Sequence, residues 1–151
     1  MIKQLPISLP GGRKTDVRTQ FAALCYRERK GKLRFLLITS RGTGRWIVPK
    51  GWPMDGHTPA ESAVKEAWEE AGVRGNCDGR CIGIFSYNKD HPELGDVPCV
   101  AMVFAIEVTE VAKNYPEADE RERQWVSRKQ AARMVDDPEL ARILRDFDPR
   151  D

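Results

Sequence analysis

Apolar residues fall in short runs along most of the chain, and these runs predict β-strands. The first two, residues 19–26 (TQFAALCY) and 33–39 (LRFLLIT), are nearly continuous and flank an Arg-Lys-Gly-Lys turn. They predict a hairpin whose strands are covered on both faces. The polar segment 88–96 predicts a loop at one rim of the sheet. Further strands are expected over residues 46–48, 80–87, 98–108 and 121–126.

One central helix is predicted between these strands. Thr58 is an N-cap candidate, Pro59 suits the first helical position, and Glu61 completes a capping box. Gly72 suits the left-handed residue that ends a helix. The helical spacing predicts one apolar face, made of Ala60, Ala63, Val64, Ala67, Trp68 and Ala71.

Two further helices are expected over residues 128–135 and 138–147, after Ser127 as an N-cap. Strands, a central helix, more strands and terminal helices together predict an α/β (α+β) layered fold. Pro6, Pro10 and two glycines interrupt any regular pattern over residues 1–16, which we interpret as a flexible N-terminal arm. Residues 17–149 are then expected to form a single domain.

Composition narrows the class of protein without naming its chemistry. A chain of 151 residues with 40% hydrophobic and 32% charged residues is large enough for its own core, which excludes collagen-like and disordered classes. Its net charge of +2 gives no global argument for nucleic-acid or membrane-surface binding. We find no apolar run suited to a secretory signal or a membrane span, and predict a cytoplasmic protein without a membrane partner.

The four cysteines do not form a zinc-binding pattern. We interpret Cys25 and Cys99, which lie in apolar runs, as buried thiols. A disulfide or metal at Cys77 and Cys81 is the less favoured alternative.

Glu66, Glu69 and Glu70 stand at i, i+3 and i+4 on the side of the central helix opposite its apolar face. They are either a solvated polar face or ligands. Glu69 and Glu70 lie in the last turn, where the helix dipole makes each negative charge unfavourable by roughly 0.3–1 kcal/mol. Lys65 is better placed to pair with Glu61 at i, i+4. A hard divalent cation, Mg²⁺ or Mn²⁺, would supply the missing partner.

The segment from Pro49 to Val73 resembles the Nudix box, Gx5Ex7REUxEExGU, in which U is aliphatic. Two positions depart from the pattern: His57 stands for the first glutamate and Lys65 for the arginine. We interpret the chain as a variant that still binds metal, with a Glu61–Lys65 pair as partial substitute bracing. The alternative is a degenerate domain that has kept the fold and lost the chemistry. The positions that match are Gly51, Glu66, Ala67, Glu69, Glu70, Gly72 and Val73.

This resemblance implies a Nudix-type α/β/α sandwich with a mixed β-sheet, a central catalytic loop–helix–loop and C-terminal helices. It also implies a pyrophosphohydrolase that uses Mg²⁺ or Mn²⁺. By resemblance, Glu66 and Glu70 are direct metal ligands, the Gly51 carbonyl is a possible further ligand, and Glu69 binds metal or activates the attacking water. The base can come from another loop in this family, and the places to look are Glu117, Glu120 and Glu122, for each of which surface charge is the alternative reading.

The segments QFAALCYR, LLITSRGTGRWIVPKGW and IFSYNK look most like the diphosphoinositol polyphosphate and diadenosine polyphosphate phosphohydrolase branch. The expected partner is therefore a phosphate-rich small molecule. ADP-ribose, nucleoside triphosphates and a capped RNA end are the alternative substrates. A capped RNA end is the one nucleic-acid partner compatible with this interpretation. In that branch, the residues that contribute to phosphate binding match Arg18, Ser40, Arg41, Lys50 and Lys89.

Two questions stay open at this stage. Trp46 and Trp52 flank Lys50 and either stack on a base or, for Trp46 above all, are buried. A function of another class, a non-catalytic Nudix-fold nucleotide-binding or regulatory domain, is also compatible with the sequence. Oligomeric state cannot be read from it.

Overall fold

The computed structural model describes residues 17–91, 93 and 95–151, so the arm predicted over residues 1–16 lies outside the described part. The strands are β1 (Arg18–Arg29), β2 (Lys32–Thr39), β3 (Trp46–Ile47), β4 (Lys50–Gly51), β5 (Val73–Asn76), β6 (Cys81–His91), β7 (Gly95–Val111) and β8 (Arg123–Ser127). The helices are α1 (Pro59–Glu66), a π-helical turn η1 (Ala67–Ala71), α2 (Arg128–Met134) and α3 (Pro138–Asp146).

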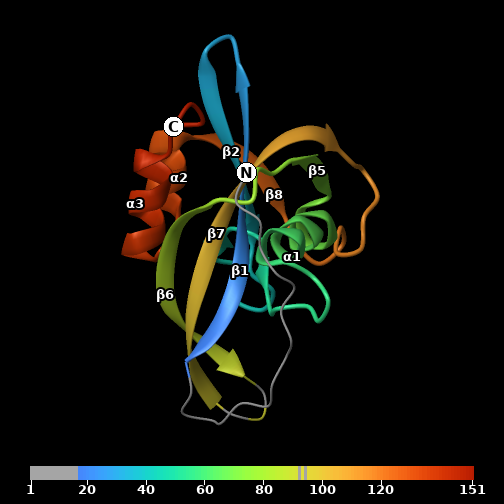
Figure 1. Cartoon of the computed structure of the whole chain (residues 1–151), viewed down its shortest axis with the longest axis vertical. Coiled ribbons are helices and arrows are strands. Elements are labelled where there is room, and N and C mark those ends of the chain that lie inside the picture. Colours follow the sequence, from blue (N-terminus) through green and yellow to red (C-terminus); the bar gives the residue numbers. More distant parts are fainter. Residues whose placement is uncertain (1–16, 92, 94) are drawn as a thin grey trace.

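The strands form one mixed sheet in the order β3-β2-β1-β7-β5. Strand β4 pairs with β1, β6 with β7, and β8 with β2. The central pair, β1 and β7, is parallel over nine residues, and the other strand pairs of the described residues are antiparallel. Figure 1 shows α2 and α3 on one side of this sheet and α1 on the other.

Alternating residues of the strands supply a core on each face of the sheet. On the α2–α3 face, Leu24 and Phe35 pack with residues of both helices, including Leu140 and Leu144. On the α1 face, Phe21 and Phe104 pack with alanines of α1 and η1. The near-continuous apolar runs thus belong to strands covered on both faces, and the predicted α/β/α layering is confirmed.

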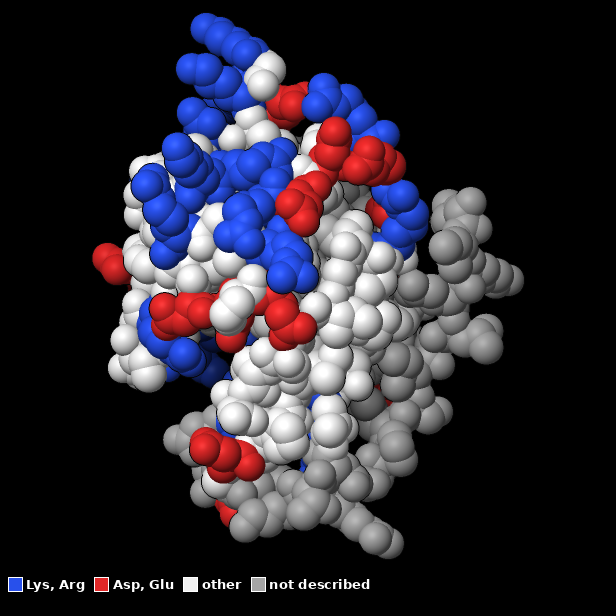
Figure 2. Space-filling view, turned by 90° about the vertical axis from the view of Figure 1, so that its left-hand side faces the viewer, with Lys and Arg blue, Asp and Glu red and all other residues white. Residues whose placement is uncertain are grey.

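The predicted β1–β2 hairpin is confirmed, with a turn tighter than the sequence pattern required. Lys30 and Gly31 both have positive φ (54° and 74°), as expected of a two-residue type I′ turn. The hairpin extends beyond the layers at the top of Figure 1. Side chains of Lys and Arg gather at its end and continue down the α2–α3 side of the molecule (Figure 2).

The loop predicted over residues 88–96 is wrong for most of its length. Strand β6 continues to His91 and β7 starts at Gly95, with Lys89 paired to Val97. Ladder hydrogen bonds come from the backbone, so a run of polar side chains does not end a strand that leaves the core. The sequence also missed β4 and β5, which are too short to show a period, and placed the start of β8 two residues too early.

The central helix has the predicted capping box. The Glu61 amide donates to the Thr58 hydroxyl at 3.2 Å, and the Thr58 amide donates to the Glu61 carboxylate at 2.7 Å. Gly72 ends the segment with φ 67°. The last turn is π-helical instead of α-helical, which the sequence did not predict.

Ala63, Ala67 and Ala71 are fully buried against the sheet, as the predicted apolar face requires. Trp68 departs from it, because it is half-buried and the Arg74 guanidinium lies 3.7 Å over its ring. Within the described residues, every helix is too short or too polar to cross a bilayer.

Candidate functional site

Glu66 and Glu70 form a buried carboxylate pair where α1 passes into η1. Their exposed fractions are 9% and 6%, whereas Glu69 between them is half-buried. A solvated polar face is therefore the wrong interpretation for Glu66 and Glu70. Carboxylates are almost never fully buried without a partner, so the pair needs a compensating charge or proton.

The two carboxyl groups are hydrogen-bonded to each other. Burial, this hydrogen bond and the charge of Glu70 raise the pKa of Glu66 to about 8. Burial also raises the pKa of Glu70, although the hydrogen bond from Glu66, the Arg121 charge and the Lys50 amide oppose that rise. In the absence of a cation, the pair is therefore expected to hold a proton at neutral pH.

Arg121 lies behind this pair, and sequence reasoning missed its role. Its side chain is 7% exposed, with Nη2 3.6 Å from Glu70 Oε2 and Nε donating to Glu117 Oε1 at 2.9 Å. Its Nη1 donates to the Thr39 carbonyl at 3.0 Å. The sequence pattern predicts only that a strand starts at Arg121, and the acidic residues around it in segment 117–122 are the available signal of its role.

Of the three loop glutamates considered as a base, Glu117 is the one inside the acidic site. Its side chain is 17% exposed, and its charge acts on both Glu66 and Glu70. The Glu117 amide also donates to the Glu69 carbonyl at 3.0 Å, which ties this loop to η1. Glu120 pairs with Arg41 at 3.0 Å, and Glu122 is exposed.

The structure brings three of the predicted phosphate-binding cations together. Arg18 on β1 is the register partner of Cys99 on β7, and Lys89 on β6 is the partner of Val97. Lys50 Nζ lies 5.0 Å from the ring centroid of Tyr87, which is itself paired with Cys99. Burial, followed by repulsion from Lys89, lowers the pKa of Lys50 to about 8. The Lys50 amide donates to Glu70 Oε1 at 3.2 Å, and the Glu70 charge acts on the Lys50 ammonium, so the Lys50 backbone joins this group to the carboxylate pair.

Ser40 and Arg41 lie on a different side of the carboxylates. The Ser40 hydroxyl bonds Thr43 Oγ1 at 2.5 Å and accepts the Arg45 amide at 3.0 Å, so it holds its own turn. Arg41 is 3.8 Å from Glu117 Oε1 in addition to its contact with Glu120. Cations therefore approach the carboxylates from two directions, and the Ser40 hydroxyl is already engaged within its loop.

The two tryptophans beside Lys50 differ in their exposure. Trp46 packs against the core beneath α2 and α3, so of the two predicted alternatives, stacking on a base or burial, the structure favours burial. Trp52 is 37% exposed.

The predicted Glu61–Lys65 bracing is wrong. Glu61 uses its carboxylate in the capping box, and no salt bridge joins it to Lys65 in the described part of the chain. His57 instead holds its own loop, with Nδ1 3.2 Å from the Asp55 carbonyl. The departures from the sequence pattern therefore alter the loop before the helix and leave Glu66 and Glu70 in place.

Gly51 is required by the position of Glu66. A Cβ at residue 51 would overlap the Glu66 carboxylate, so a side chain there would displace it. The two buried carboxyl groups of Glu66 and Glu70, beside the Gly51 backbone, offer the oxygen ligands that hard divalent cations prefer. Among residues 17–91, 93 and 95–151, no group of three or more His, Cys, Asp or Glu side chains is spaced to hold a metal ion.

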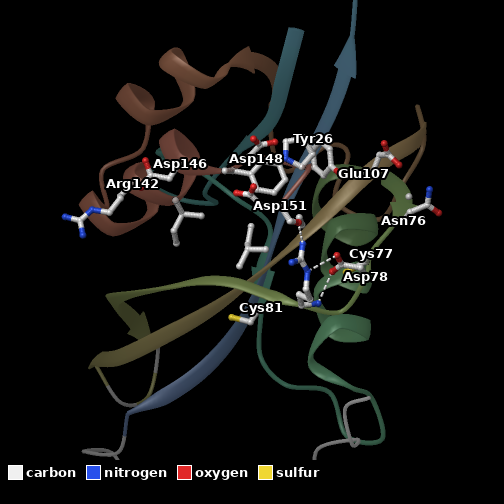
Figure 3. Close-up of a pocket in the computed structure, with 17 residues that line it drawn as sticks. Tyr26, Asn76, Cys77, Asp78, Cys81, Glu107, Arg142, Asp146, Asp148 and Asp151 are labelled. Atoms are coloured by element: carbon white, nitrogen blue, oxygen red, sulfur yellow. Dashed lines mark hydrogen bonds and ion pairs between the residues drawn. The ribbon is translucent and has the colours of Figure 1, made fainter. Parts of the chain in front are cut away.

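A cavity of about 900 Å³ lies away from these residues, between the β5–β6 connection, α3 and the chain end (Figure 3). Tyr26, Cys77 and Glu107 contribute to its lining, and Arg80 bridges Asp78 and Asp151 across it. None of the carboxylates or cations described above lines this cavity. The chemistry of the buried pair, and not cavity size, therefore identifies the candidate site.

A family model described as "NUDIX domain" matches residues 17–147. The chain is 33% identical over 116 residues to diphosphoinositol polyphosphate phosphohydrolase 3-alpha of Mus musculus, covering 76% of this chain and 66% of that protein. It is 32% identical over 119 residues to the mitochondrial Nudix hydrolase 12 of Arabidopsis thaliana, covering 77% and 59%. The chain thus spans about three fifths to two thirds of these relatives' length.

The fold is also similar to that of solved structures. A C. elegans Ap4A hydrolase superposes with a TM-score of 0.60 at 19% identity, covering 86% of this chain and 95% of that one. A MutT protein from Methanosarcina mazei Go1 gives the same TM-score and identity, covering 88% and 94%. At this identity the similarity concerns the fold alone.

Proposed function

This chain belongs to the Nudix family, and we propose that it is a divalent-cation-dependent hydrolase that cleaves a phosphoanhydride (pyrophosphate) bond in a phosphate-rich small molecule. The observation that carries the proposal is the buried Glu66–Glu70 pair, to which the Lys50 amide donates and on which the Lys50 charge acts. A polyphosphate chain needs cations around it and a hard metal ion at the bond that breaks, and this arrangement can supply both.

The proposed metal-binding groups are the carboxylates of Glu66 and Glu70, with the Gly51 carbonyl as a further ligand. A bound Mg²⁺ or Mn²⁺ would neutralise developing phosphate charge and lower the pKa of a bound water. Arg121 would hold Glu70 in position through its 3.6 Å contact. Glu69, which is half-buried on the same turn, either adds a ligand or takes the proton from the attacking water.

Glu117 is a second candidate for that base. It lies within 2.9 Å of Arg121 and is close enough to Glu66 and Glu70 to raise the pKa of both. Glu69 and Glu117 are joined through their backbones, so either carboxylate would act from the same edge of the site. A general base must reach the attacking water directly, within about 2.6–3.2 Å.

Substrate phosphates would be held by Arg18, Lys50 and Lys89 on one side and by Arg41 on the other. We propose a diphosphoinositol polyphosphate or a diadenosine polyphosphate as substrate. A curated relative is named for the first, the sequence segments resemble the branch that acts on both, and this number of cations suits several phosphates. Exposed Trp52 would be free to contact a base. We also propose that Ser40 lies near the substrate phosphates. We propose a cytoplasmic location for the protein.

The direct experiment is product analysis with Mg²⁺ or Mn²⁺ present. Diadenosine polyphosphates, diphosphoinositol polyphosphates, ADP-ribose, nucleoside triphosphates and capped RNA ends would be supplied in turn. We expect cleavage of a diphosphate linkage in one of the first two classes. No product from any substrate, together with a raised melting temperature on ligand addition, would support the non-catalytic binding or regulatory alternative instead.

A further inference from the structure

A second basic region lies apart from the carboxylate pair. It is a groove of about 780 Å³ formed by the turn end of the β1–β2 hairpin, α2, the end of α3 and the chain after it. None of Gly51, Glu66, Glu70 or the cations beside them lines this groove. Helix α2 covers one face of the sheet and α1 the other, so groove and carboxylates lie on opposite sides (Figure 1).

The groove concentrates positive charge in a nearly neutral chain. Seven of its thirteen lining residues are Lys or Arg and one, Glu28, is acidic, so the lining carries a formal charge of +6. The whole chain carries +2, which leaves −4 for everything else. Figure 2 shows this accumulation as a continuous region of Lys and Arg below the hairpin.

Most of these cations are not used to hold the fold. Arg128 is an exception, because its Nη1 donates to the carbonyls of Leu144 and Arg145 at 2.9 and 3.0 Å. Two others are also engaged: Arg150 pairs with Asp148 at 3.0 Å, and Arg34 Nη1 donates to the Leu33 carbonyl at 3.0 Å. In the described chain, the side chains of Lys32, Lys129, Arg133 and Arg145 make no hydrogen bond or salt bridge with other residues.

Like charges gathered without carboxylate partners repel one another, and a polyanion relieves that repulsion. The four unengaged side chains come from β2, α2 and the end of α3, so they surround the groove from separate elements. We propose that this groove binds a compact anion with several phosphate groups, at a site separate from the hydrolytic one.

The lining favours a small polyphosphate over a nucleic acid. A groove of about 780 Å³ falls within the roughly 300–1,000 Å³ of small-molecule sites. Its lining contains no Phe, Tyr, Trp or His on which bases could stack. Phosphate recognition is thus available here, and base recognition is not.

The groove can be tested with a matched pair of double variants. Lys129→Gln with Arg133→Gln removes two exposed groove cations from α2, and Lys113→Gln with Arg142→Gln removes one exposed Lys and one exposed Arg outside it. Amide NMR spectra of the 17.2 kDa chain would be followed during titration with inorganic tripolyphosphate in EDTA and low salt. The readout is binding at the groove amides and not turnover, so the result does not depend on the proposed function.

We expect saturable shifts of the amides of Lys32, Lys129 and Arg133. The groove double should bind roughly tenfold more weakly, from two exposed charge contacts of about 0.7 kcal/mol each, while the control double binds as the wild type does. Raised salt should weaken binding in the wild type. If the groove double does not fold, Arg145→Gln on α3 supplies the same test with a smaller loss.

Two results would overturn the proposal. One is an absence of saturable groove shifts, or equal affinity in both doubles. The other is tighter binding of a ten-nucleotide uridine RNA than of tripolyphosphate at the same amides, which would make the groove a nucleic-acid site.

Discussion

The Arg121 guanidinium holds the acidic site together, and its replacement by glutamine tests that role. It is 7% exposed, lies 2.9 Å from Glu117 and 3.6 Å from Glu70, and donates to the Thr39 carbonyl. Breaking a buried ion pair costs about 3–5 kcal/mol, because it leaves a charge without its partner. Glu70 can take up a proton instead, so we expect the lower end, a loss of about 3 kcal/mol in the free energy of unfolding.

Urea denaturation followed by tryptophan fluorescence, at neutral pH and without divalent cations, measures this loss. The matched control is Arg74→Gln, since Arg74 pairs with Glu110 at 3.2 Å with both side chains more than half exposed. Together with its contact to Trp68, that pair should contribute about 1 kcal/mol. If Arg121→Gln costs no more than Arg74→Gln, then Arg121 does not hold the acidic site as described.

Three further predictions concern the residues around the helix. Gly51→Ala should push the Glu66 carboxylate away, lowering turnover by about 100-fold while stability changes by about 1–3 kcal/mol, as kinetics and denaturation would show. Without divalent cations, stability should fall as pH rises from 4.5 to about 8, because folded Glu66 keeps a proton that the unfolded chain releases. Glu66→Gln should flatten that part of the denaturation curve, and a slope equal to wild type would contradict the assignment. His57→Glu should be tolerated in turnover assays, and a large loss would reveal a role for His57 beyond its loop contact.

Much of the fold could be predicted because local signals agreed with the final packing. The apolar runs of β1 and β2 and the capping box at Thr58 are readable without tertiary context. The parts of β6 and β7 beyond residue 87 could not be predicted, because there the strands are set by backbone pairing and not by a side-chain pattern. The π-helical turn was also hidden, since the spacing of its residues suits an α-helix equally well.

The candidate site also contains residues that could be predicted from the sequence and residues that could not. Glu66 and Glu70 could be singled out from their spacing, and their burial agrees with a role beyond surface charge. Arg121 could not be, because its importance arises from a contact with a glutamate 51 residues earlier in the chain. The supposed Glu61–Lys65 pair failed for a local reason, since the helix cap uses the same carboxylate.

The most direct test of the account is the Mg²⁺ dependence of phosphate release by Glu70→Gln beside wild type. The matched control is Glu110→Gln, which alters an exposed carboxylate whose salt-bridge partner is Arg74 and not a residue of the acidic site. We predict that wild-type and control turnover rise and saturate with Mg²⁺, while Glu70→Gln loses at least about 100-fold, equivalent to roughly 3 kcal/mol of barrier, and stays folded. Wild-type turnover in folded Glu70→Gln, or undiminished turnover in EDTA, would contradict the central claim.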